Sequence, residues 1–115
     1  MIIKETKTDI SKNRFGGNGD VIIEHYLDEK LLNDSVVMYA KVILKPGCSL
    51  GYHKHEGNSE TIVVLQGTAE YNDNGTAVTL HAGDKVHCPS GESHSIGNAA
   101  DAKEDLLLQA LVIKK

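Results

Sequence analysis

The stretch GCSLGYHKHEGNSETIVVLQG, residues 47–67, contains two closely spaced histidines, a glutamate and a β-branched run that ends at a glycine. Residues 61–65 favour a strand because Thr, Ile and Val pack well on a pleated surface. This run stops at Gly67, and the stretch itself begins where another apolar run stops, at Pro46 and Gly47. Short apolar runs bounded by Gly, Pro, Asn or Asp are typical of all-β sandwiches and barrels.

The same alternation of apolar runs and turn residues extends outward in both directions. Asn74 and Gly75 form a strong hairpin signal between two of the runs. Helical periodicity is weak and confined to residues 99–108, where residues 99–105 could form a short helical turn. We therefore predict an all-β protein of eight or nine short strands, arranged as a double-stranded β-helix (jelly roll) or a closed barrel. The runs expected to form strands beyond the quoted stretch are residues 21–27, 36–44, 68–71, 76–80, 85–88, 93–96 and 106–113.

Length and composition limit the functional classes. A chain of 115 residues accommodates one domain, and 40% hydrophobic with 24% charged residues is ordinary for a globular protein. The net charge of -4 and the lack of a basic patch argue against nucleic-acid binding. No apolar run approaches the roughly 18 residues of a membrane span, and residues 1–7 do not resemble a signal peptide. We expect a cytoplasmic location, in which Cys48 and Cys88 are free thiols.

The chain divides into an N-terminal arm and one β-domain. Residues 6–20 are polar and rich in glycine, so we expect residues 1–20 to form an arm or an edge strand, which could also pair with a second subunit. Residues 21–115 then form the barrel. The apolar alternation of Thr61, Val63 and Leu65 would leave an outer surface that a second copy could cover. On this ground we expect a homodimer.

The residues with metal-binding chemistry are His53, His55, Glu60 and His94. Residues i and i+2 of a strand share one face, so His53 and His55 should project together. A hairpin after His55 would carry Glu60 back beside them, which would form a two-histidine, one-carboxylate set. His94, beyond Pro89, could then be brought alongside by closure of the barrel. Such a set suits one divalent transition metal (Mn, Fe, Ni, Cu or Zn) with positions open for a ligand, although an isolated HxH is more often structural.

The spacing of these residues resembles the two motifs of the cupin superfamily. The first motif, G(X)5HXH(X)3–4E(X)6G, is matched by residues 47–67, and the second, G(X)5PXG(X)2H(X)3N, is matched by residues 83–98. Together with the piece between them they cover a little under half of the chain. The resemblance implies a conical β-barrel of six to eight strands with a metal inside, held by His53, His55, Glu60 and His94. Asn98, the last residue of the second motif, is expected to cap a turn and not to bind the metal, because Asn favours turn positions. The resemblance does not fix the reaction, because one fold hosts many functions.

The remaining pocket residues leave two functions open. The interior face of residues 36–44 should be the apolar one, and Gln109 is a polar group that could face in or out. His87 could carry protons beside the metal, although an exposed strand histidine is the simpler interpretation. Arg14, the single arginine, lies in the N-terminal segment, so we expect a lysine or the metal to anchor any dianion. The first hypothesis is a metal-dependent enzyme, oxygenase- or lyase-like, acting on a small organic substrate. The alternative is a non-catalytic cupin that binds a metal or a small ligand.

Overall fold

The computed structural model describes all residues, 1–115, and has an all-β fold of two antiparallel sheets, with one short 3-10 turn, η1 (Arg14–Gly16). The fold class expected from the sequence is therefore confirmed. The ten strands are β1 (Thr8–Lys12), β2 (Asp20–His25), β3 (Val36–Leu44), β4 (Ser49–Lys54), β5 (Asn58–Gln66), β6 (Thr68–Asp73), β7 (Thr76–His81), β8 (Lys85–Cys88), β9 (Ser93–Asn98) and β10 (Leu106–Lys114).

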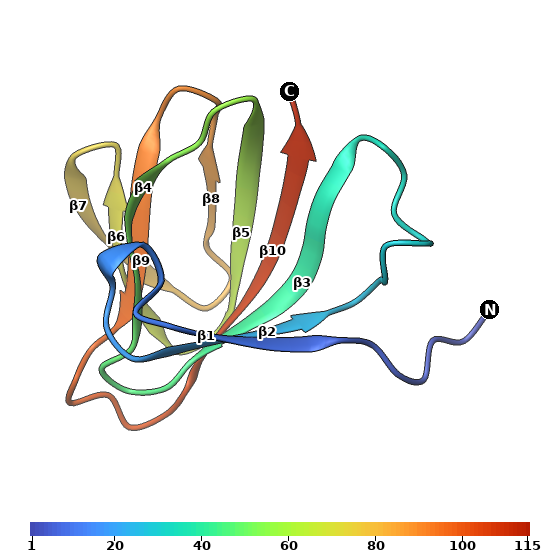
Figure 1. Cartoon of the computed structure of the whole chain (residues 1–115). Coiled ribbons are helices and arrows are strands. Elements are labelled where there is room, and N and C mark those ends of the chain that lie inside the picture. Colours follow the sequence, from blue (N-terminus) through green and yellow to red (C-terminus); the bar gives the residue numbers. More distant parts are fainter.

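The two sheets form opposite walls of the barrel (Figure 1). The larger sheet has the strand order β1-β2-β3-β10-β5-β8, and the smaller has the order β4-β9-β6-β7. The chain therefore crosses from one sheet to the other six times, at the connections β3–β4, β4–β5, β5–β6, β7–β8, β8–β9 and β9–β10. Because of these crossings, residues that are close in the sequence lie on opposite walls, where their side chains can face one another. No helix of the structure is both long and apolar enough to span a bilayer.

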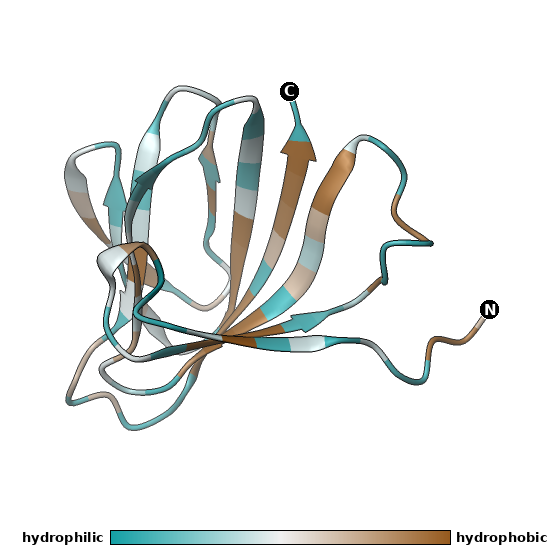
Figure 2. Cartoon of the chain, viewed as in Figure 1, coloured by the Kyte–Doolittle hydropathy of each residue, from teal (hydrophilic) through white to brown (hydrophobic).

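The barrel interior is filled by one face of each long strand. On β3, Ala40, Val42 and Leu44 are buried, as the apolar alternation predicted, and Met38 packs against them. Glu60, Ile62 and Val64 are the inward residues of β5. Figure 2 shows hydrophobic colouring along much of β3 and β10, whereas β4 and β9 carry paler and more polar stretches. The apolar core is thus concentrated on the larger sheet, and it leaves room for polar groups where the smaller sheet faces it.

Two segments whose form the sequence left open are defined in the structure. Residues 8–12, expected as a loop, an arm or an edge strand, form β1 at the edge of the larger sheet and pair with β2. This pairing brings the number of strands to ten. An apolar pattern did not reveal β1, because its backbone hydrogen bonds to β2 do not depend on such a pattern. Residues 99–105 contain turns and bends but no helical turn. Asn98 fixes this connection, since its side-chain amide donates to the carbonyl oxygens of Leu44 and Glu104 at 3.0 and 2.9 Å.

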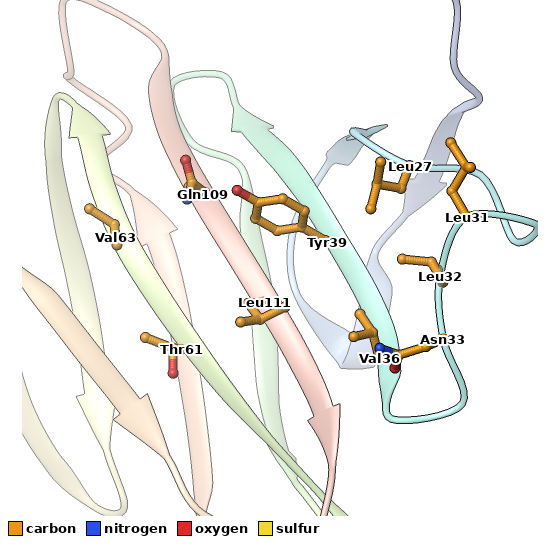
Figure 3. Close-up of a pocket in the computed structure, with 10 residues that line it drawn as sticks. All are labelled: Leu27, Leu31, Leu32, Asn33, Val36, Tyr39, Thr61, Val63, Gln109 and Leu111. Carbon is orange, nitrogen blue, oxygen red and sulfur yellow. The ribbon is translucent and has the colours of Figure 1, made fainter. Parts of the chain in front are cut away.

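Gln109 lies on the outer face of the larger sheet, since its neighbours Leu108 and Ala110 are the buried residues of β10. Figure 3 shows it in a groove with Tyr39 and Val63, and the volume of this groove is about 420 Å³. The groove shares no lining residue with the cavity that holds the histidine cluster. A role for Gln109 in positioning a substrate inside the barrel is therefore wrong.

Candidate metal centre

The structure brings the four side chains singled out in the sequence to one point inside the barrel. His53 lies on β4, His55 follows the end of that strand, Glu60 lies on β5 and His94 on β9. One potential ligand atom from each lies within 4.8 Å of all the others. His53 and His94 are directly opposite in the β4–β9 register. His55, Glu60 and His94 are buried, and His53 is partly exposed, so the cluster opens to solvent on one side.

Glu60 reaches the cluster by a different route from the predicted hairpin. β4 pairs with β9, and β5 pairs with β10 and β8, so the hairpin expectation is wrong. After β4 the backbone is held by the loop before β9: the His55 amide donates to the Glu92 carbonyl at 3.0 Å, and the Gly91 amide donates to the His55 carbonyl at 2.7 Å. The chain then crosses to the larger sheet. Glu60 consequently faces the histidines from the opposite wall, which closes the cluster from both sides.

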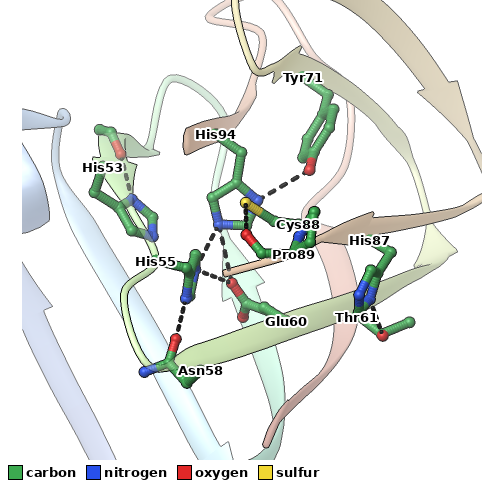
Figure 4. Close-up of polar contacts among 11 residues, drawn as sticks. His53, His55, Asn58, Glu60, Thr61, Tyr71, His87, Cys88, Pro89 and His94 are labelled. Carbon is green, nitrogen blue, oxygen red and sulfur yellow. Dashed lines mark hydrogen bonds and ion pairs between the residues drawn. The ribbon is translucent and has the colours of Figure 1, made fainter. Parts of the chain in front are cut away.

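Each imidazole is oriented by a hydrogen bond on its Nδ1 side (Figure 4). Nδ1 of His53 lies 2.8 Å from the Gly51 carbonyl oxygen, and Nδ1 of His55 lies 2.6 Å from Oδ1 of Asn58. Both partners accept only, so each Nδ1 carries the proton, and in the neutral ring Nε2 presents a lone pair. Nδ1 of His94 lies 2.9 Å from the Tyr71 hydroxyl oxygen. Outer partners of this kind are what fix the ligating tautomer of a histidine at metal sites.

Ring nitrogens and a carboxylate oxygen lie close together at the centre of the cluster. Nε2 of His55 lies 3.0 Å from Nε2 of His94, and Oε1 of Glu60 lies 3.3 and 3.0 Å from these two atoms. Nε2 of neutral His55 and Oε1 of Glu60 are acceptors, and Nε2 of His94 is a third acceptor when its Nδ1 donates to the Tyr71 hydroxyl. Acceptors at such separations repel unless a proton or a metal ion lies between them. Three imidazole nitrogens and one carboxylate are a donor set that suits divalent transition metals from Mn to Zn. The residues present therefore fit a metal, which would supply Lewis acidity and open coordination positions.

The burial and close contacts of these side chains also shift their pKa values. Burial tends to raise the pKa of Glu60, but the hydrogen bonds with His55 and His94 outweigh it and hold this pKa at about 2. Burial lowers the pKa of His53 below its ordinary value of 6.5. The hydrogen bond with Glu60 raises the pKa of His55 above that value. At pH near 6 the metal-free protein should therefore carry the proton of the cluster on His55.

Metal binding is expected to release more protons at pH 6 than at pH 8. A ligating histidine must be neutral, so a metal displaces the proton of His55 at any pH below that residue's raised pKa. Metal affinity should accordingly fall as the pH drops through this range. Calorimetric titration with Mn²⁺ or Zn²⁺ in buffers of different ionisation enthalpy measures the number of protons released. Equal release at pH 6 and pH 8 would contradict the assignment.

Tyr71 is a site residue that sequence reasoning missed. It lies on β6, is buried, and its hydroxyl contacts His94 as described above. Burial raises the pKa of Tyr71 well above its ordinary value of 10, so the phenol stays protonated. The β6 alternation places Ala69 and Tyr71 on the inner face and could have indicated an inward phenol. The partner of that phenol depends on the β6–β9 register, which no local pattern in the sequence reveals.

The substitution Tyr71→Phe is expected to weaken metal affinity about 10-fold and to leave the fold intact. It removes the hydroxyl oxygen that would accept from Nδ1 of His94 when Nε2 binds a metal. Loss of such an outer partner costs roughly 10- to 100-fold at comparable metal sites. Competition with a coloured chelator measures the affinity. Tyr52→Phe is the matched control, since Tyr52 is 51% exposed and does not line the cavity beside the cluster. Unchanged affinity in Tyr71→Phe would show that the phenol does not orient the ligand.

A cavity of about 350 Å³ opens onto the cluster. His53, His55 and Glu60 line its floor, and Arg14 and Phe15 of the N-terminal turn line it as well. Arg14 therefore lines the pocket, although it lies in the N-terminal segment of the sequence. The turn lies against β4. No pattern in the N-terminal segment indicated this contact. The phenyl ring of Phe15 stacks on the His53 imidazole with the centroids 4.0 Å apart.

His87 does not belong to this site. It is exposed, and its Nδ1 makes a hydrogen bond of 2.8 Å with the hydroxyl of Thr61 on the outer face of the larger sheet. On β8 the inward residue is its neighbour Cys88, which is buried and free. The simpler interpretation of His87, as an exposed strand histidine, is confirmed, and a proton-carrying role beside the metal is wrong.

Comparison with known proteins finds relatives over most or all of the chain. A Thermotoga maritima protein named "Oxalate-binding protein" is 40% identical over 101 residues, which cover 88% of this chain and 82% of that protein. A crystal structure from Thermotoga maritima, described as a predicted oxalate decarboxylase, superposes over the full length of both chains with a TM-score of 0.91 and 36% identity. A cupin barrel protein of Salinispora arenicola, at 24% identity, shares the fold with a TM-score of 0.74, over 100% of this chain and 89% of that one. The family model described as "Cupin domain" matches residues 40–108, more than half of the sequence. The chain therefore belongs to the cupin family.

Proposed function

We propose that this cupin binds one divalent transition metal through His53, His55, Glu60 and His94, and uses it to bind a small dicarboxylate such as oxalate. The observation that carries the proposal is the convergence of these four side chains within 4.8 Å, at a point where His53, His55 and Glu60 line a cavity. A transition metal with four protein ligands retains positions for exogenous oxygen ligands. The name of the Thermotoga maritima relative supports oxalate as the ligand to be tested first.

The cavity suits a small anion better than a large substrate. Its volume of about 350 Å³ is at the lower end of the range for small-molecule sites. Apart from the proposed ligands, its charged side chains are few, namely Arg14, Lys54 and Glu56. A dicarboxylate can chelate a metal through one oxygen of each carboxylate. Binding would then depend mainly on the metal and little on a large complementary surface.

A metal-dependent enzyme, oxygenase- or lyase-like, is the second candidate, because Glu56 lines the same cavity and could exchange protons with a bound ligand. In the structure the Glu56 carboxylate is paired with Nζ of Lys54 at 3.1 Å and is 74% exposed. A solvated, ion-paired carboxylate is an acceptor and not a proton donor. This arrangement favours binding over catalysis.

Calorimetric titration of oxalate into the protein tests the proposal. The protein is first stripped with a chelator and then loaded separately with Mn, Fe, Ni, Cu or Zn. We expect one oxalate per chain with at least one metal and none without metal. The absence of oxalate binding with every metal, or equal binding by the stripped protein, would overturn the proposal. Assays for formate, carbon dioxide and oxygen consumption in the same samples separate the binding protein from the enzyme.

We also propose a homodimer in a reducing, cytoplasmic compartment. The outer groove with Val63 and Leu111, and the 44% exposure of Leu65, support a second copy as the partner of this face. Both cysteines are free, as expected in a reducing compartment. Sedimentation velocity over a range of concentrations measures the state of association, and a monomer at all concentrations would contradict the dimer.

A further inference from the structure

The turn between β1 and β2 is held firmly against β4, beside the cluster (Figure 1). The Ser49 amide donates to the Asn18 carbonyl at 2.8 Å, and the Asn18 amide donates to Oγ of Ser49 at 3.0 Å. The side-chain amide of Asn18 donates to the Gly47 carbonyl at 2.7 Å. These bonds join segments about thirty residues apart in the sequence. The turn is therefore part of the wall of the site and not a free arm.

Two glycines permit this close contact. A Cβ atom on Gly17 would clash with the Ser49 carbonyl oxygen and would lie 2.7 Å from the Gly51 amide nitrogen. A Cβ atom on Gly51 would clash with the Phe15 carbonyl oxygen. Gly17 has a φ of -74°, which any residue adopts, so close packing and not backbone conformation is the reason for glycine here.

The turn also carries backbone strain. Asn13 and Phe15 have φ angles of 53° and 54°, in the left-handed region that a bulky residue such as Phe rarely adopts. Core packing does not explain this conformation, because Phe15 is 52% exposed. Its effect is to place the phenyl ring on His53, with an angle of 15° between the ring planes. Strain held in place by surrounding contacts is typical of functional sites.

The strained turn presents Arg14 to the cavity. Arg14 is the only arginine of the chain, and its guanidinium lies 5.1 Å from the centroid of the Phe15 ring. It forms no ion pair and no hydrogen bond with another side chain of the protein. The other cation that lines the cavity, Lys54, is already paired with Glu56. Arg14 is thus the cation free to meet an anion that enters the site.

The charges of the site match a dianion. Lys54 and Glu56 neutralise each other, whereas a divalent ion, the Glu60 carboxylate and the Arg14 guanidinium together carry about two positive charges. A guanidinium also offers a planar fork of donors that fits two parallel oxygens. We propose that Arg14, held by the Phe15 turn, recognises the carboxylate oxygens of the ligand that the metal does not bind, and so sets a preference for dianionic over monoanionic acids. This inference rests on the proposed function.

Oxalate and oxamate distinguish the role of charge, since oxamate has nearly the same shape and one charge fewer. Both are titrated calorimetrically into the metal-loaded protein, and the metal content is measured before and after each titration. We expect Arg14→Gln to weaken oxalate binding about 10- to 100-fold and oxamate binding less than about 3-fold. Arg14→Lys keeps the charge but not the planar fork of donors. Its oxalate affinity should lie between the affinities of Arg14→Gln and of the unaltered protein. Lys12→Gln removes a charge from the adjacent exposed strand and should change neither affinity.

Gly17→Ala tests the turn while Arg14 is retained. The added methyl group should displace the turn from β4, weaken oxalate binding about as much as Arg14→Gln does, and leave one metal per chain. If Arg14→Gln or Gly17→Ala keeps both the oxalate affinity and the preference for oxalate over oxamate, the inference is overturned. The proposed function would still stand. If the unaltered, metal-loaded protein binds no oxalate, both proposals fall.

Discussion

Replacing His55 with alanine is expected to weaken metal binding by roughly 100- to 1000-fold, so that dialysed protein retains almost no metal. Structural zinc sites with four ligands bind with about 10–16 kcal/mol, so each ligand accounts for a few kcal/mol. His55 is buried at the centre of the cluster, with its Nε2 3.0 Å from Nε2 of His94 and its Nδ1 held by Asn58. No other imidazole is placed to substitute for it. Elemental analysis after dialysis against a weak chelator measures the metal retained.

His87→Ala is the matched control for this experiment. It removes the same side chain from β8, the strand beside Glu60, but on the outer face, where His87 contacts Thr61. Metal content should remain at about one equivalent per chain. Equal metal content in His55→Ala and His87→Ala would show that the cluster is not the binding site.

The largest expected effect on stability is that of Leu108→Ala, with a loss of about 2–5 kcal/mol in the free energy of unfolding. Leu108 lies on β10, which pairs with β3 and β5, and its side chain is 1% exposed. Removal of its three outer carbons leaves a cavity that the two flanking strands cannot fill without breaking their registers. Urea denaturation of chelator-treated protein gives the value without the contribution of bound metal.

Ile10→Ala removes the same number of carbon atoms at an exposed position of β1. Ile10 is 66% exposed, so its truncation should cost less than about 1 kcal/mol. Comparable losses in the two variants would mean that the core does not lie where the strand alternation places it.

The site was predictable from the sequence where local rules apply. A strand alternates its faces, so Glu60, Ile62 and Val64 had to share one face, and the structure buries all three. The spacing of His53 and His55 likewise indicated a common side. The link between these residues and His94 came from the resemblance to the cupin motifs, because closure of a barrel cannot be read from spacing alone.

The parts that could not be predicted depend on which strands become neighbours. The hairpin expected after His55 failed because hydrogen bonds to the loop before β9 direct the chain into the opposite sheet. Tyr71 meets His94 through the β6–β9 register. The Arg14 turn reaches the cavity because glycines 17 and 51 let two distant backbones touch. None of these contacts leaves a periodic signal in the sequence.

The most direct test of the metal centre is the anomalous scattering of crystals of the metal-loaded protein, recorded on both sides of the absorption edge of the metal. The structure predicts one anomalous peak per chain, about 2.0–2.3 Å from the Nε2 atoms of His53, His55 and His94 and from a carboxylate oxygen of Glu60. A peak elsewhere on the chain, or a peak whose ligands do not include these four side chains, would contradict the account.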